Sequence, residues 1–78
     1  MSRIEEAILI MKQVNSFGFP SEYPPLKELS KRLSDYVKTG QGWSGIIKFK
    51  EYNRYADVIL PSKPSVPIQV VLKFKKYN

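Results

Sequence analysis

The segment IQVVLKFKK, residues 68–76, alternates along its length and decides the fold class. One set of alternate positions is wholly apolar: Ile68, Val70, Leu72 and Phe74. The other set is mainly polar: Gln69, Val71, Lys73 and Lys75. Because successive side chains of a strand point to opposite faces, this period of two predicts a β-strand with one covered face and one open face.

Two earlier segments have the same period. They are residues 44–52, SGIIKFKEY, and residues 54–60, RYADVIL. Asn53 between them is typical of a tight turn, and the three prolines in residues 61–67 predict a stiff connector to the last strand. The sequence therefore predicts three strands, at about 44–52, 54–60 and 68–76.

The N-terminal part of the chain has a helical period instead. Ser2-Arg3-Ile4-Glu5 has the form of a capping box, and apolar residues then recur at helical spacing. We expect a helix over about residues 3–15. Leu9 and Ile10 widen its apolar face, which predicts burial on more than one side.

A second apolar stripe follows at helical spacing: Leu26, Leu29, Leu33, Tyr36 and Val37. It begins after Pro24 and Pro25, which the first turn of a helix tolerates, and Gly40 is a natural C-terminal stop. We expect a second helix over about residues 25–39.

The order of these elements predicts an α+β fold in one domain, residues 1–78. An N-terminal αα-hairpin would pack on one face of a C-terminal three-stranded antiparallel β-meander. The odd residues of the first strand and the even residues of the other two would face the helices. The open face would then carry Ile46, Lys48, Lys50, Tyr52, Tyr55, Asp57, Val71, Lys73 and Lys75.

Positive charge is concentrated in the second half of the chain. Residues 1–40 hold six Lys or Arg against five Asp or Glu, whereas residues 41–78 hold seven against two. The net charge of +6 therefore comes mostly from the predicted sheet region. Such a field attracts nucleic acid or an acidic protein surface.

The open face is the candidate binding surface, because lysines neutralise phosphates while tyrosine rings stack on unpaired bases. Residues at the turn, on the connector and at the C-terminus extend it. The predicted nucleic-acid interface comprises Lys48, Lys50, Tyr52, Arg54, Tyr55, Lys63, Lys73, Lys75 and Lys76. The alternative is a solvated face whose lysines only protect the strand edges from aggregation.

Catalysis has little support in the sequence. The chain has no histidine and no cysteine, and Glu5 and Glu6 are adjacent on a helix, where their side chains diverge. Residues 40–45, GQGWSG, have the glycines of a phosphate loop, but a helix precedes them and a strand follows, which is the reverse of the required order. We expect no enzyme activity, no catalytic residues, no metal site and no cofactor, and we interpret Trp43 as a core anchor for the second helix.

Two functions remain open. The first is a small basic nucleic-acid-binding module, and the sequence does not distinguish between RNA and DNA as its ligand. The second is a protein-interaction module (an inhibitor, adaptor or accessory subunit) that binds an acidic partner surface, with a homodimer through a free strand edge also possible. The first residues lack the features of a secretory signal, and no apolar run is long enough to span a membrane, so we expect an intracellular protein, cytoplasmic or nuclear.

Overall fold

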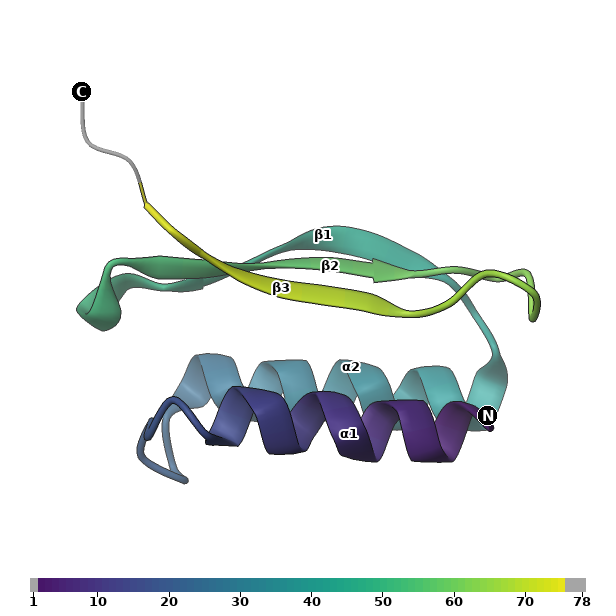
Figure 1. Ribbon diagram of the computed structural model, residues 1–78, viewed down its shortest axis with the longest axis horizontal. Helices are drawn as coiled ribbons and strands as arrows, with labels where there is room; N and C mark the ends of the chain where they lie inside the picture. The colour runs from purple at the N-terminus through teal and green to yellow at the C-terminus, as the bar shows by residue number, and fades with distance from the viewer. Residues whose placement is uncertain (1, 76–78) are drawn as a thin grey trace.

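Two helices lie beneath one face of a three-stranded sheet (Figure 1). The computed structural model describes residues 2–75. Its elements are α1 (Arg3–Asn15), α2 (Pro24–Thr39), β1 (Trp43–Phe49), the 3₁₀ turn η1 (Lys50–Tyr52), β2 (Arg54–Leu60) and β3 (Gln69–Phe74). The strands are antiparallel in the order β1-β2-β3. The predicted fold, an αα-hairpin followed by a β-meander, is confirmed.

Local signals set the ends of both helices. The Ser2 side chain accepts a hydrogen bond from the backbone N–H of Glu5 at 3.2 Å, as the capping box predicts. Proline occupies the first two positions of α2. Gly40 ends that helix with a φ of 70° and donates its N–H to the carbonyl of Tyr36 at 2.8 Å. A side chain at Gly40 would be strained in this left-handed conformation.

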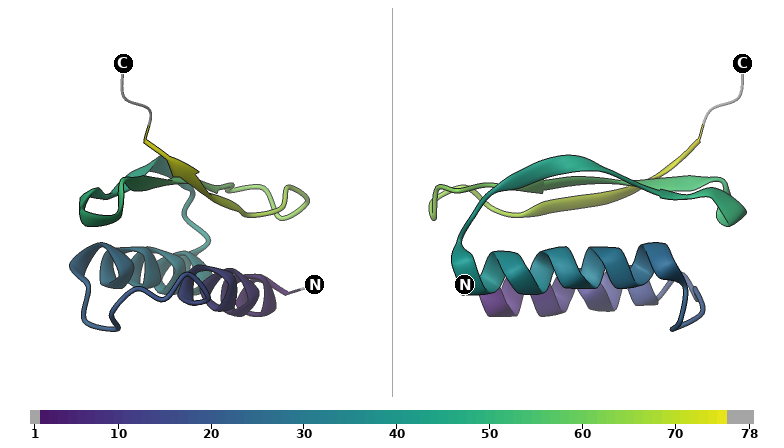
Figure 2. Two further views of the ribbon diagram at one scale, coloured as in Figure 1. Left: turned by 60° about the vertical axis from the view of Figure 1, so that its left-hand side comes forward. Right: turned by 180° about the vertical axis from the view of Figure 1, so that it is seen from behind.

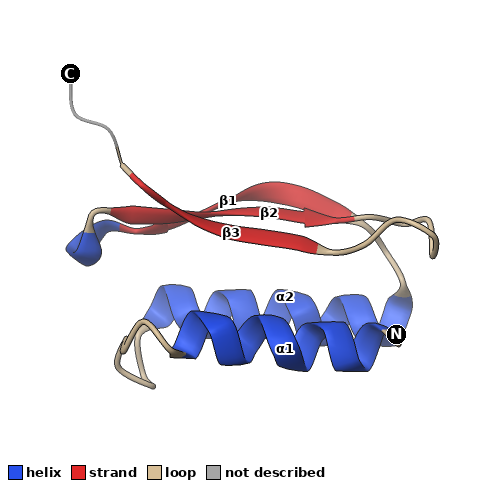
Figure 3. Cartoon of the chain, in the orientation of Figure 1, coloured by secondary structure: helices blue, strands red, loops and turns tan. Residues whose placement is uncertain are grey.

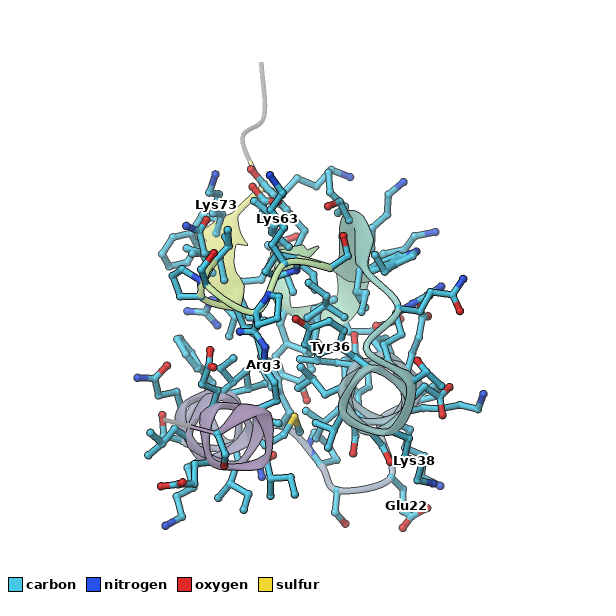
Figure 4. The ribbon with its side chains drawn as sticks, turned by 90° about the vertical axis from the view of Figure 1, so that its right-hand side faces the viewer. Arg3, Glu22, Tyr36, Lys38, Lys63 and Lys73 are labelled. Carbon is cyan, nitrogen blue, oxygen red and sulfur yellow. The ribbon has the colours of Figure 1, made fainter. Side chains whose placement is uncertain are left out.

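The core lies between the two layers. α2 supplies four buried side chains, Leu26, Leu29, Leu33 and Tyr36, whereas α1 supplies only Val14. The odd residues of β1 and the even residues of β2 face this core, as predicted. In an end-on view α2 lies beneath β1, and α1 lies beneath β3 (Figure 4). No charged or polar residue is buried within the described part of the chain.

The first predicted strand is too long. β1 ends at Phe49, and residues 50–52 form η1 instead (Figure 3). Asn53, in the left-handed conformation with a φ of 53°, closes this turn and leads into β2. The backbone therefore leaves the sheet at Lys50, although the alternation of the sequence continues past it. β3 is also shorter than predicted, because it begins after Ile68 and ends at Phe74.

α1 is less buried than its sequence predicts. Ile4 is 58% exposed, Ile8 is 51% exposed and Leu9 is 47% exposed, so the outer side of this helix has no cover in the described chain. The reason is architectural. With only two layers, α1 has one sheet and one neighbouring helix to pack against, which leaves its far side open (Figure 2).

The connector between β2 and β3 is fastened to α1. Arg3 donates from Nη2 to the carbonyl oxygens of Lys63 and Val66, each at 2.8 Å. Its Nη1 lies 3.1 Å from a carboxylate oxygen of Glu6, and Glu6 accepts the backbone N–H of Ile68 at 3.1 Å. These contacts fix the start of β3 over the N-terminal end of α1.

Tyr36 of α2 reaches the same region from the other helix. Its hydroxyl donates to the carbonyl of Pro61, and the guanidinium of Arg3 lies 5.5 Å from the centre of its ring. Figure 4 shows Arg3 and Tyr36 between the helices and the sheet, with Lys63 on the connector above them. This end of the molecule is therefore held by polar contacts as well as by packing.

Candidate nucleic-acid interface

A row of two lysines and one tyrosine crosses the open face of the sheet. Lys48 of β1 pairs with Tyr55 of β2, and Tyr55 pairs with Lys73 of β3. Neighbouring strands lie about 4.8 Å apart, so the two lysine backbones are roughly 10 Å from each other with the tyrosine between them. Lys73 lies on the side of the sheet away from the helices (Figure 4). We call these three residues the Lys-Tyr-Lys row.

Further basic residues lie at the end of the sheet where η1 turns the chain. Lys50 is exposed in η1, and Lys75 follows β3, where its backbone N–H donates to the carbonyl of Asn53 at 2.9 Å. Both residues line a small surface hollow of about 150 Å³ together with Lys48 and Tyr55 of the row. The hollow is lined by Ile46, Lys48, Lys50, Arg54, Tyr55 and Lys75.

Acidic groups do little to neutralise this end of the face. Asp57 forms an ion pair with Lys73 at 3.3 Å, one position along from the Lys-Tyr-Lys row. Both side chains are largely in water, where such a pair is weak and competes poorly with a phosphate ligand. The lining of the hollow includes Lys and Arg side chains and no Asp or Glu. The local field is therefore positive.

The remaining acid near the turn is held on the helix side. Glu51 of η1 accepts a hydrogen bond from the hydroxyl of Tyr23, which lies just before α2. This hydrogen bond lowers the pKa of the Glu51 carboxyl below its ordinary value. Burial of Tyr23, reinforced by the same hydrogen bond, raises the pKa of its hydroxyl. The pair links the turn to the loop between the helices.

The structure removes Tyr52 from the open face. Its ring packs edge-on against Phe19 at 4.9 Å and against Tyr23 at 5.3 Å between ring centres, and both partners belong to the helix side. The physical reason is η1, which turns residues 50–52 out of the strand and lets an aromatic cluster form beneath the turn. Tyr52 is thus a packing residue in this arrangement, whereas the prediction placed it among the lysines.

Arg54 lines the hollow, but its guanidinium group is held among aromatic rings and not beside the lysines of the row. As an even residue of β2 it belongs to the covered face, and its guanidinium lies 5.2 Å from the ring centre of Phe17 and 4.6 Å from that of Phe74. Such cation–π contacts hold the guanidinium between two rings. No feature of the local sequence indicates this sandwich, because its three members come from a loop and two strands.

Lys63 is separated from the other candidate residues. It lies on the connector at the opposite end of the sheet from η1 (Figure 3). β2, with seven residues, spans the distance between the two ends, which is roughly 20 Å. A ligand would have to run the length of the strands to contact both ends. Lys76, the last predicted interface residue, lies outside the described residues.

The far half of the open face is mostly uncharged. Beyond the Lys-Tyr-Lys row, Ile46 and Val71 flank Asp57, and Ser44 and Gln69 flank Ile59. Lysine side chains are absent from these two rows. The face is therefore graded, with its cations gathered at one end.

Trp43 packs on the helix side, as the interpretation of a core anchor requires. The guanidinium of Arg32 in α2 lies 3.7 Å from the centre of the indole ring, and the ring packs against the core. Arg32 also meets Glu28, and Lys31 meets Asp35, each at 3.4 Å. Residues 40–42 simply connect α2 to β1, so the glycines here serve a helix-to-strand connection.

A second surface feature lies between the helices, on the side away from the sheet. This groove of about 420 Å³, which we call the helix groove, includes exposed parts of Ile4 and Ile8. Its apolar lining is Ile4, Ala7, Ile8, Met11, Leu33 and Val37. Its only charged lining residues are Lys12 and Lys38. The sequence did not predict it, because the apolar side of α1 was expected to be covered.

The described residues were also compared with the requirements of a metal site and of a membrane span. Among residues 2–75, no three acidic side chains come together in a way that could hold a metal ion. Neither helix in this range is long and apolar enough to cross a membrane. Comparison with protein families, curated proteins and solved structures found no match to this chain.

Proposed function

We propose that this protein is a non-catalytic nucleic-acid-binding module that uses the basic end of the open sheet face. The observation that carries the proposal is the Lys-Tyr-Lys row, in which the strand register sets Tyr55 between Lys48 and Lys73. Two cations beside one aromatic ring suit a ligand that alternates phosphates and bases. Lys50 and Lys75 add charge at the same end.

Binding of this kind depends strongly on salt, because each lysine that neutralises a phosphate releases a counterion. If Lys48, Lys50, Lys73 and Lys75 each contact one phosphate, the logarithm of the affinity falls against the logarithm of salt concentration with a slope of about −3 on single strands and about −4 on duplex. The slope measures how many cations take part.

A titration of fluorescent oligonucleotides at several salt concentrations tests the proposal. The double variant Lys48→Gln/Lys73→Gln should bind more weakly and flatten the slope by about 1.5, because two phosphate contacts are lost. The matched control is Lys27→Gln/Lys31→Gln, which removes the same charge from the outer side of α2 and should retain the wild-type slope. Equal losses in both variants, or no salt-dependent binding by the wild type, would refute the proposal.

The helix groove favours a second candidate function, a protein-interaction module. Its apolar lining with lysines as the only charged residues suits an amphipathic partner helix that carries acidic residues, since such a helix lays its apolar side into a groove. Ile8→Asp should abolish capture of such a partner after nuclease treatment. The same change at Ile59, an exposed residue of the open face, should leave capture of the partner unchanged. Capture of the partner by the Ile8→Asp variant would exclude the helix groove as its binding site.

A further inference from the structure

The hollow beside Tyr55 differs in character from the charged surface around it. Its surface is mostly apolar although four of its six lining residues are Lys or Arg, because the aliphatic stems of these long side chains form its walls. Ile46, which is 57% exposed, lies on the adjoining strand at the side of the hollow.

The size of the hollow restricts what enters it. Sites for cofactors and drug-sized ligands occupy about 300–1,000 Å³, well above the roughly 150 Å³ available here. A single planar ring system fits better than a whole nucleotide. The ring of Tyr55 on one side and the Ile46 side chain offer such a ring system the two kinds of surface on which bases stack or rest.

The Lys-Tyr-Lys row then places a candidate phosphate contact on each side of Tyr55. Lys48 and Lys73 flank Tyr55 on the two neighbouring strands, and Lys50 and Lys75 lie at the turn end. A base inserted beside Tyr55 therefore has cations within reach of its own phosphate and of the next one. In a duplex, the same base keeps both of its faces inside the stack and cannot enter.

We infer that the hollow is a pocket for one unpaired base, so that the protein prefers single-stranded nucleic acid to duplex. The inference rests on the proposed function and specifies its ligand. It assigns separate roles within one surface: the lysines supply affinity for any phosphate backbone, whereas Tyr55 and Ile46 supply the preference for unpaired bases.

The test compares a 12-nucleotide oligo(dT), a 12-nucleotide oligo(U) and a 12-base-pair mixed-sequence duplex at one low salt concentration. Wild-type protein should bind at least one single strand about tenfold more tightly than the duplex. Tyr55→Leu should weaken single-strand binding by about tenfold or more, the loss expected for one stacked base, and leave duplex binding nearly unchanged. Tyr55→Phe should retain the preference, because it keeps the ring.

The matched control is Ile59→Ala, an exposed apolar residue of the same strand and face outside the hollow. It should bind both ligands as the wild type does. If Tyr55→Leu does not fold, changes in the amide chemical shifts of the wild-type protein test the location of the pocket instead. Shifts on adding oligo(dT) or oligo(U) that centre on Ile46 and Tyr55 support the pocket, and shifts confined to other positions overturn it.

The outcomes separate this inference from the proposed function. Equal affinity for single strands and duplex, with Lys48→Gln/Lys73→Gln still weakening both, overturns the base pocket and leaves the nucleic-acid module standing. Failure to bind any of the three oligonucleotides in a salt-dependent manner overturns both. A single-strand preference that persists in Tyr55→Leu overturns the pocket alone.

Discussion

Arg3 is a cation near the surface whose hydrogen bonds are all internal. Its Nη2 donates to two carbonyl groups of the connector, and its Nη1 donates to the carboxylate of Glu6. The planar fork of a guanidinium can reach two carbonyl oxygens at once, whereas an ammonium is a point charge. Arg3 is thus matched to the shape of the connector.

Replacement of Arg3 should therefore destabilise the protein although it removes no apolar side chain from the core. Arg3→Ala leaves the Lys63 and Val66 carbonyl groups without these donors, and we expect the free energy of unfolding to fall by about 1–3 kcal/mol. Arg3→Lys should restore less than half of that loss. Urea unfolding measures both. An unchanged midpoint for Arg3→Ala would show that water replaces the donor fully.

Gly45 is a second position where a single residue decides the local packing. A Cβ atom built on it would lie 2.6 Å and 2.7 Å from two ring carbons of Trp43, which is closer than Cβ atoms approach non-bonded atoms in folded proteins. Gly45→Ala should push the indole off Arg32 and cost about 1–3 kcal/mol of stability. Because Trp43 is the only tryptophan, its fluorescence emission should shift as well. Unshifted emission would contradict this packing.

Glu51 of the turn η1 and Tyr23 form a hydrogen-bonded pair of titratable groups. The pKa of Glu51 is lowered below its ordinary 4.5 in the folded protein, so the unfolded chain binds a proton more readily. The resulting stabilisation is present above about pH 4.5 and is lost as the pH falls through the folded pKa. The raised pKa of Tyr23 also stabilises the folded protein, but this stabilisation is present below about pH 10 and is lost as the pH rises above 10.

Thermal unfolding between pH 6 and pH 3 should reveal this pair. The melting temperature of the wild type should fall more steeply over this range than that of Glu51→Gln, which has no carboxyl group to protonate at this position. Tyr23→Phe is a second variant that lacks the donor and should also show the shallower fall. Parallel pH profiles for all three proteins would mean that the pair contributes nothing to stability.

Sequence patterns predicted the strands and their covered faces well because alternation is a local property. The end of β1 was not predicted for the same reason. Polar and apolar residues continue to alternate through Lys50, although the backbone leaves the sheet after Phe49. The displacement of Tyr52 depends on Phe19 and Tyr23, which are far away in the sequence. The Lys-Tyr-Lys row was predictable as a set of residues, but its register and the hollow beside it required the paired strands.

At the scale of the whole molecule, the two helices contribute unequally. α2 is central to the core, and α1 leaves much of its apolar side exposed. We therefore expect α1 to tolerate substitution better than α2, because stability follows the apolar surface removed from water rather than the apolar content of the sequence.

Two substitutions should separate these roles. Leu33→Ala, at a side chain that is 2% exposed, should cost about 2–5 kcal/mol in free energy of unfolding. Ile8→Gln, at a half-exposed position, should cost less than about 1 kcal/mol and improve solubility. Urea denaturation of the two variants measures the contrast. A loss at Ile8 as large as that at Leu33 would indicate that the protein studied in solution covers this helix.

The fastening of the connector to α1 bears on the order of events in folding. The αα-hairpin and the β-meander each form from neighbouring segments, whereas Arg3 and Lys63 are 60 residues apart. Closing so long a loop has an entropic cost that two hydrogen bonds offset only after the loop is closed. We therefore expect these bonds to form after the rate-limiting step. Arg3→Ala should then accelerate unfolding and leave the refolding rate nearly unchanged in stopped-flow experiments. The N-terminal turn of α1 would be the last part of the chain to dock and the first to open.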